Sequence, residues 1–425
     1  MNLHLAGGRI IDPANNRDEI GDILVQDGVV KQVGRVDAGQ ADVKRIDCAG
    51  KVVAPGLIDI HVHLRVPGQE YKEDVASGTA AAAAGGFTAI ACQPNTQPPI
   101  DRAGIVRQIA ELAVGASARV HVIAAVSIGL EHKELVEMAE LKDAGAVAVG
   151  DDAFPVQDSG FLRRAMEYCH MLDLPYIAHC EDKSLTGDGV MSEGYVSTVL
   201  GLKGIPRWAE NIGTARNAQL AMATGCHLHV LHVSTKESVE IVRQAKRLGA
   251  PITAETCPQY VSATDEACIG YNTNAKMSPP LRTKEDQDAI KEGLADGTLD
   301  LIATDHAPHA AHEKEREFAL APFGMIGLET SLGLVITHLV KPGVITLAQM
   351  VDKMSTQPAR LLGVPGGSLG VGDVADITVF DPDLQWTVNP AVFKSKSRNT
   401  IYGGTELTGK AVATIVGGRL IESAS

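Results

Sequence analysis

The 425-residue chain lacks the features that mark nucleic-acid-binding and membrane proteins. It has no excess of basic residues: 38 lysines and arginines face 52 aspartates and glutamates, for a formal net charge of −14. A surface of that sign disfavours nucleic acid and anionic lipid as partners. The longest apolar stretch, residues 79–92, is too short to cross a bilayer. Because the N-terminus has neither a basic segment nor a long apolar core, we expect no signal peptide.

The sequence also lacks any Cys-x-x-Cys pair. Its seven cysteines are scattered, and an odd number without chelating spacing predicts free thiols in a reducing cytoplasm. The rest of the composition, 45% hydrophobic and 21% charged, is typical of a globular enzyme. The length suits one large domain with a smaller one.

The middle of the chain alternates between strand and helix patterns. Eight apolar strand candidates begin near Leu57, Phe87, Arg119, Ala146, Pro175, His227, Pro251 and Leu299. Helical patterns lie between most of them, for example at 102–114, 131–144 and 238–248. Eight strands alternating with helices predict an α/β fold, a (β/α)8 TIM-type barrel, over residues 56–364.

The two ends of the chain have a different texture of short strands and turns. Strand candidates occupy 20–25, 28–33 and 44–48 near the start and 376–380, 411–416 and 418–421 near the end. We therefore expect one small β-sandwich domain built from both terminal segments, residues 1–55 and 365–425.

Metal-seeking side chains stand at the carboxyl ends of the barrel strands. They are His61 and His63 after the first strand, Asp152 after the fourth, His179 after the fifth, His232 after the sixth and Asp305 after the eighth. Strand ends of a (β/α)8 barrel meet on one face, where such enzymes carry their active sites. Four imidazoles and two carboxylates suit zinc and are enough for one or two ions.

A histidine in an apolar strand is more often a hydrogen-bonded core residue than a metal ligand. His61 and His63 differ, because side chains at i and i+2 share a face and two such rings at a strand end need a common partner. Asp152 competes with its neighbour Asp151, which suits a capping or loop role instead.

Taken together and in order, the motifs resemble the amidohydrolase superfamily and, within it, the bacterial dihydroorotases. The matching segments are His61-Val62-His63-Leu64-Arg65, Gln93-Pro94-Asn95-Thr96, Asp151-Asp152, His179-Cys180-Glu181-Asp182, His232-Val233-Ser234, Thr304-Asp305-His306-Ala307-Pro308-His309 and Pro322-Phe323-Gly324. Relatives such as hydantoinases usually carry a carboxylated lysine at the strand-four position. Here the nearest upstream lysine is Lys142, ten positions before Asp152, and an aspartate is the variant of one dihydroorotase group.

The resemblance implies a zinc-dependent cyclic amidohydrolase. Its reaction would be the reversible cyclisation of N-carbamoyl-L-aspartate to L-dihydroorotate plus water, the third step of de novo pyrimidine (UMP) biosynthesis. Asp305 would be the catalytic general base and then acid. The substrate contacts would be Arg65, Asn95, Ser278, His309, Phe323 and Gly324. Arg65 offers a planar fork for a carboxylate, and Ser278 stands where many relatives have asparagine.

Other functions fit the sequence less well. A hydantoinase-type enzyme needs no carboxylate clamp, and a weak or inactive scaffold for aspartate transcarbamoylase would be expected to lose metal ligands that are all present here. A nucleobase deaminase would show a different His/Glu arrangement. The resemblance implies a homodimer and leaves a transcarbamoylase complex open. Residues 310–324 have the charge pattern of a mobile lid.

Overall fold

Eight parallel strands form the centre of the molecule in the computed structural model, which describes residues 2–36 and 43–421. In sheet order they are β6 (Leu57–Val62), β7 (Phe87–Cys92), β8 (Arg119–Ala125), β9 (Ala146–Gly150), β10 (Tyr176–Ala178), β13 (Leu228–Val230), β14 (Ile252–Thr256) and β15 (Leu301–Ile302). All eight lie where the sequence predicts them, so the predicted barrel is confirmed.

The barrel closes between its first and last strands at the end that carries the polar side chains. Val62 and His306 form a parallel bridge. The His63 amide donates to the His306 carbonyl at 2.9 Å, and the His306 amide donates to the His61 carbonyl at 3.2 Å. Closure therefore depends on the segment that immediately follows Asp305.

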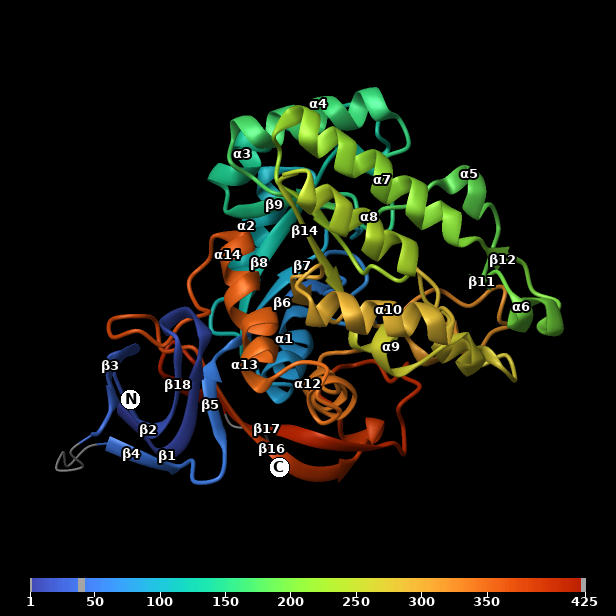
Figure 1. Cartoon of the computed structure of the whole chain (residues 1–425). Helices are drawn as coiled ribbons and strands as arrows, with labels where there is room; N and C mark the ends of the chain where they lie inside the picture. Colours follow the sequence, from blue (N-terminus) through green and yellow to red (C-terminus); the bar gives the residue numbers. More distant parts are fainter. Residues whose placement is uncertain (1, 37–42, 422–425) are drawn as a thin grey trace.

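Helices cover the outside of the barrel, as Figure 1 shows for α4, α7, α8 and α10. The connecting helices are α1 (Val75–Ala84), α2 (Ala103–Leu112), α3 (Met138–Asp143), α4 (Ser159–Met171), α7 (Arg207–Thr224), α8 (Lys236–Arg247) and α10 (Lys284–Ala295), with α12 (Ser331–Val335) after β15. Smaller elements are α5 (Lys183–Thr186), β11 (Met191–Ser192), α6 (Tyr195–Leu200), β12 (Gly204–Ile205), α9 (Pro258–Ser262), α11 (Ala311–Lys314), α13 (Leu347–Val351) and α14 (Gln357–Leu362). Short 3-10 segments are η1 (Pro13–Asn15), η2 (Ile128–Leu130), η3 (Asp265–Cys268), η4 (Thr273–Ala275) and η7 (Pro390–Val392), and π-helical turns are η5 (Ile336–Val340) and η6 (Asp352–Thr356). In the described part of the chain, none of the helices combines the length and apolar character needed to cross a bilayer.

Helix α8 shows how local sequence sets these elements. Val239, Val242 and Ala245 recur at helical spacing and are buried, which gives the helix one apolar face for the barrel. The Thr235 side chain accepts a hydrogen bond from the backbone of the first turn and caps the start. Gly249, with φ of +81°, follows the last turn in a conformation that favours glycine.

The predicted helix over 131–144 is wrong in its first half, because α3 begins only at Met138. The preceding residues fold back on the end of β8 instead. Ser127 and Leu135 form an antiparallel bridge, and the Ile128 amide donates to the Glu134 carbonyl. Tertiary pairing has overridden a helix-favouring local sequence here.

Both termini contribute to one second sheet, seen below the barrel in Figure 1. Its strands are β1 (Asn2–Asp12), β2 (Arg17–Gln26), β3 (Val29–Gly34), β4 (Val43–Asp47), β5 (Val52–Pro55), β16 (Ile377–Thr387), β17 (Glu406–Val416) and β18 (Arg419–Ile421). Strand β5 joins the two halves, since it pairs parallel with β1 and antiparallel with β16. Leu5, Ile23, Val25, Ile377 and Ile415 are among the buried side chains of its own small core.

We propose domain boundaries at residues 55/56 and 364/365. Pro55 ends a strand of the terminal sheet and Leu57 begins the barrel, while α14 ends at Leu362 before the chain returns to that sheet. Residues 1, 37–42 and 422–425 of the proposed small domain lie outside the described residues.

Candidate active site

The six predicted metal ligands come together at one end of the barrel. Strand β6 carries His61 and leads into His63, and the segments after β9, β10, β13 and β15 carry Asp152, His179, His232 and Asp305. All six side chains are buried. Because the strands are parallel, their carboxyl ends share one face, and this register brings residues far apart in sequence to one point.

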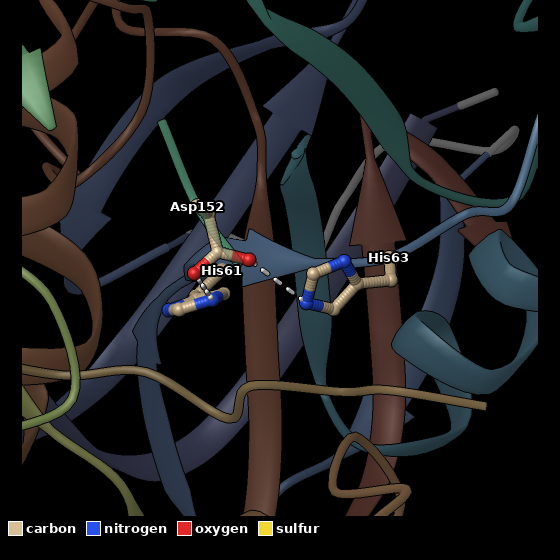
Figure 2. Close-up of side chains that lie close together, drawn as sticks. All are labelled: His61, His63 and Asp152. Atoms are coloured by element: carbon tan, nitrogen blue, oxygen red, sulfur yellow. Dashed lines mark ion pairs between the residues drawn. The ribbon is translucent and has the colours of Figure 1, made fainter. Parts of the chain in front are cut away.

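Asp152 lies at the centre of the cluster. Its Oδ1 atom is 3.6 Å from Nε2 of His61, 3.5 Å from Nδ1 of His179 and 3.5 Å from Nε2 of His232. Its Oδ2 atom is 3.4 Å from Nε2 of His63, and Figure 2 shows His61 and His63 turned toward this carboxylate. Two three-residue groups of the kind that hold a metal therefore share Asp152.

Asp305 follows β15, the strand that lies next to β6 where the barrel closes, and its side chain lies beside the same group. Its Oδ1 atom is 3.3 Å from Nε2 of His63 and 3.5 Å from Nε2 of His61. A carboxylate there can contact both the centre and any molecule bound above it, which is the position that proton transfer requires.

The geometry of the rings fits a bound cation. Nε2 of His61 is a buried nitrogen with no hydrogen-bond partner among the described residues, although it faces two carboxylates. Nδ1 of His179 and Nε2 of His232 lie 2.9 Å apart and point to the same place. Inward-facing nitrogens and carboxylate oxygens are the ligand set that a borderline-soft divalent ion such as zinc takes.

Electrostatics favour a positive charge at this centre. Burial alone would lower the pKa of His61, but Asp305, Asp152 and Glu255 raise it well above its ordinary value. Burial alone would raise the pKa of Asp152, but His61, His179 and His232 hold it well below its ordinary value. Carboxylates kept ionised in a dry pocket create a negative potential that a cation would offset.

In three of the four histidines, the ring nitrogen that points away from the cluster donates a hydrogen bond to a second residue. His61 donates through Nδ1 to Glu255 at 2.7 Å, and His63 donates through Nδ1 to the Asn95 side chain at 2.9 Å. His179 donates through Nε2 to Glu181 at 3.1 Å. Such partners fix which nitrogen faces the metal.

Sequence reasoning missed Glu255 and Glu181. Glu255 is the one charged residue of strand β14, and it is fully buried. That isolated charge was an available signal, because a buried carboxylate needs a partner. Glu181 lies two residues after His179, inside one of the segments that carry the family resemblance, and its role became visible only from the contact with the ring.

A cavity of about 480 Å³ opens above the centre. Its lining includes the predicted residues His63, Arg65, Asn95, Asp152, His179, Ser278, Asp305, His309, Phe323 and Gly324. All six predicted substrate contacts thus border one space. His61 and His232 are buried beside Asp152, which lines that space. The lining also includes Lys72, Phe154, Glu181 and Lys183, which sequence reasoning did not identify.

Arg65 and His309 form the basic side of this cavity. The Arg65 guanidinium donates to the Pro308 carbonyl at 3.2 Å and lies 3.4 Å from Nε2 of His309. Burial lowers the pKa of Arg65 to about 10, so it stays charged at neutral pH. Burial, with the charges of Arg65 and nearby lysines, lowers the pKa of His309 to about 2 and keeps its ring neutral. Arg65 thus offers one positive charge to an anionic group, beside a neutral ring whose Nδ1 is left as an acceptor.

Gly324 leaves no room for a side chain on the facing wall. A Cβ atom there would lie 2.7 Å from Cβ of Ala307 and 3.0 Å from Nε2 of His309, and its φ is +137°. The neighbouring Phe323 carbonyl accepts from Nε2 of His309 at 2.8 Å. The predicted lid segment therefore contacts the cavity through its last residues; its mobility stays a prediction.

Three site residues have a left-handed backbone. Arg65, His232 and Asp305 have φ of +61°, +34° and +49°. Side chains other than glycine rarely adopt this region, and each such residue costs on the order of 1 kcal/mol or more. The packing of the strand ends holds these residues in conformations that the isolated chain would avoid.

Comparison with protein-family models identifies two regions of the chain. Residues 50–238 match the family described as dihydro-orotase-like, and residues 318–421 match the amidohydrolase family. The first match contains the strand ends that carry five of the six candidate ligands, from His61 to His232.

Curated relatives match over nearly the whole chain. A dihydroorotase from Geobacter metallireducens is 52% identical over 422 residues, covering 99% of both chains. A dihydroorotase from Syntrophotalea carbinolica is 51% identical over 421 residues, again covering 99% of both. Among solved structures, an L-hydantoinase from Arthrobacter aurescens has a TM-score of 0.89 at 26% identity, over 99% of this chain and 95% of its own. The hydantoinase reading is the weaker one, because the dihydroorotases share about twice that identity.

Proposed function

The chain belongs to the dihydroorotase family of cyclic amidohydrolases, and we propose that its cavity would hold two zinc ions, with Asp152 common to both groups of ligands. Dihydroorotases interconvert N-carbamoyl-L-aspartate and L-dihydroorotate plus water in pyrimidine biosynthesis. Members of this family and of the wider amidohydrolases depend on a metal, and a matching His/Asp cluster is present here. The observation that carries the proposal is the sharing of Asp152 between two ligand groups.

The first ion would take His61, His63 and Asp152, and the second would take Asp152, His179 and His232, with Asp305 beside the first. An aspartate in the bridging place sets this chain apart from relatives with a carboxylated lysine. When bound, zinc supplies Lewis acidity, which polarises a carbonyl and makes water acidic enough to attack near neutral pH.

Asp305 would carry the proton of the reaction. In hydrolysis it takes a proton from the attacking water as the C–O bond forms, and it gives that proton to the ring nitrogen as the C–N bond breaks. In cyclisation the same carboxylate takes the proton from the attacking carbamoyl nitrogen and passes it to the departing oxygen. Its position against both His61 and His63 supports this role.

Arg65 and Asn95 would donate to the substrate carboxylate, and His309 would contact the substrate beside them through Nδ1, because its Nε2 donates to the Phe323 carbonyl. The Arg65 fork can take two carboxylate oxygens, and the Asn95 amide nitrogen is the atom it offers, since its oxygen accepts from His63. Ser278 lines the same cavity and would add one hydroxyl, and Phe323 and Gly324 would shape the wall.

We also infer a homodimer in the cytoplasm, with a complex with aspartate transcarbamoylase as an open question. All seven cysteines are free and buried, which supports a reducing compartment. Tyr195 and Val199 on α6 and Trp208 at the start of α7 are exposed apolar side chains, and such residues suit a contact between copies. Light scattering of the pure chain, with and without the transcarbamoylase, would measure the assembly.

The decisive experiment measures turnover and metal content of the purified chain together. We expect bound zinc, near two ions per chain, and turnover of both L-dihydroorotate and N-carbamoyl-L-aspartate. Hydantoin and dihydrouracil, which lack the carboxylate, should be poor substrates. Arg65→Lys keeps the charge but loses the fork and should raise KM for the carboxylated substrates, whereas Arg163→Lys, an exposed change on α4, serves as the matched control.

The outcomes separate the alternatives. Preferential turnover of hydantoin would replace this function with a hydantoinase. Bound zinc without any turnover would point to dependence on a partner, and a single ion with full activity would remove the bridging role of Asp152.

A further inference from the structure

The side chain of Asn399 makes three hydrogen bonds to the backbone of two separate loops. Its Oδ1 accepts from the His309 amide at 3.1 Å. Its Nδ2 donates to the Ala307 carbonyl at 3.0 Å and to the Gly324 carbonyl at 3.1 Å. The amide orientation is fixed by these partners, because one is a donor and the other two are acceptors. Asn399 is 4% exposed, so each bond is made away from bulk water.

The residues held by Asn399 form part of the cavity, while Asn399 itself does not line it. Ala307, His309 and Gly324 all border the cavity, on the wall that includes Arg65. They belong to the chain after β15 and to the last turn of the predicted lid segment. Asn399 therefore connects two sides of the cavity near Arg65 through hydrogen bonds, from a position outside the cavity lining.

Asn399 reaches this place from the terminal part of the chain, in the connection between β16 and β17. That connection is anchored to the barrel just before Asn399. The Ser395 hydroxyl donates to Glu73, and the Ser397 hydroxyl donates to the Lys72 carbonyl. The Ile326 amide donates to the carbonyl of Asn399 itself at 3.0 Å. These hydrogen bonds hold the backbone around Asn399 and so give its side chain a defined position.

A second buried group acts on the same wall. The Lys314 amine donates to the Pro322 carbonyl at 2.9 Å and to the Gly324 carbonyl at 3.0 Å. The Gly324 carbonyl thus accepts from both Lys314 and Asn399. Of the two, Asn399 alone also bonds the His309 amide, so it couples the glycine wall to the histidine.

We propose that Asn399 is a positioning residue for substrate binding, which sets the distance between His309 and Gly324 in the cavity near Arg65. The inference rests on the proposed function, because it assumes that His309 contacts the substrate. It extends that function to a residue outside the barrel. Loss of these hydrogen bonds would shift His309 and Gly324, weaken substrate binding and leave the proton chemistry at Asp305 largely intact, so KM would change more than kcat.

The test replaces Asn399 by aspartate, which exchanges the amide nitrogen for an oxygen and keeps the size of the side chain. The Asn399→Asp variant keeps an acceptor for the His309 amide but sets an oxygen against the carbonyls of Ala307 and Gly324. We expect KM for both substrates to rise about tenfold, because both hydrogen bonds to these carbonyls are lost, with kcat changed less than about threefold. Asn389→Asp is the matched control: Asn389 lies in the same connection, is exposed and caps η7.

A double-mutant cycle with His309→Ala shows whether Asn399 acts through His309. We expect Asn399→Asp to raise KM far less in the His309→Ala background than in the wild type. Additive effects, or a fall in kcat with unchanged KM, would overturn the proposal. Metal content and the melting temperature are measured for each variant, and Asn399→Ser replaces the aspartate variant if that variant does not fold. Failure of both to fold would assign Asn399 to stability alone and also overturn it.

The same cycle separates this inference from the proposed function. If His309→Ala binds both substrates with the wild-type KM, the proposed substrate site is wrong. If His309→Ala raises KM and Asn399→Asp does not, the site stands and only the role of Asn399 fails.

Discussion

Replacing Glu255 by glutamine should weaken metal binding without disturbing the shape of the barrel. Glu255 accepts from Nδ1 of His61 at 2.7 Å and from Nε2 of His229 at 3.2 Å, and it is fully buried. A glutamine oxygen can still accept from His61. Its amide can donate to His229 if that ring instead donates through Nδ1 to Thr253, which lies 2.9 Å away. The substitution therefore removes the charge and keeps the hydrogen bonds.

The expected size follows from the role of that charge. A carboxylate behind a ligating histidine makes the ring a better donor to the metal, and losing such a partner typically costs about 10- to 100-fold in metal affinity. This equals about 1.4–2.7 kcal/mol of binding free energy. Because hydrogen bonds and volume are preserved, we expect the melting temperature of the metal-free protein to change little.

The assay titrates metal-free protein with zinc against a competing chelator and measures the dissociation constant. Asp59→Asn is the matched control, because Asp59 is an equally buried carboxylate that accepts from the backbone amides of His61 and Thr304 and not from a ring. Unchanged zinc affinity in Glu255→Gln would refute the reasoning. Equal losses in both variants would show that general negative charge matters and that the ring contact does not.

Three further predictions concern the proton, the fold and the equilibrium. Asp305→Ala should retain some metal while turnover falls by about 10²- to 10⁴-fold, measured as kcat, and near-normal turnover would mean that another base acts. Burial raises the pKa of Glu329 from 4.5 to about 7, so its contribution to stability is complete at low pH and is lost as the pH rises toward 7. Relative to Glu329→Gln, the free energy of unfolding of the wild type should fall by about 1–2 kcal/mol as the pH rises from 4.5 to about 7, a value discounted for the partial exposure of the Glu329 side chain. Parallel unfolding curves of the two proteins at all pH values would contradict this. Cyclisation consumes one proton, so the ratio of dihydroorotate to carbamoyl aspartate should fall about tenfold per pH unit near neutrality, and a constant ratio would disprove that stoichiometry.

The sequence was sufficient for the barrel because its signals were local and repeated. Strands such as β9 are short apolar runs, and five of the eight barrel strands lead into a metal-seeking side chain such as Asp152. Parallel strands then place those ends together by geometry alone, so the His/Asp cluster needed no knowledge of distances. The β-rich character of the two ends could also be predicted, but strand β1 and the pairing of the ends through β5 were not.

What could not be predicted depends on contacts between distant segments. Nothing near Asn399 in the sequence indicates that its amide bonds to the backbone at Ala307 and Gly324. The helix predicted over 131–144 starts late because Ser127 pairs with Leu135, a contact that periodicity does not report. The left-handed backbone at Asp305 likewise arises from packing, since aspartate itself carries no requirement for it.

The pairing of β5 with β16 has a consequence for synthesis on the ribosome. Strand β5 leaves the ribosome early, but its partner lies far downstream, since Pro55 pairs with Ile377 and Val52 pairs with Phe380. Until that late segment emerges, a fully buried apolar strand has an unpaired edge, which is a template for pairing with other chains. The nascent protein should therefore need protection by chaperones through most of its translation, and truncated chains that end before residue 377 should aggregate even if their barrel is complete.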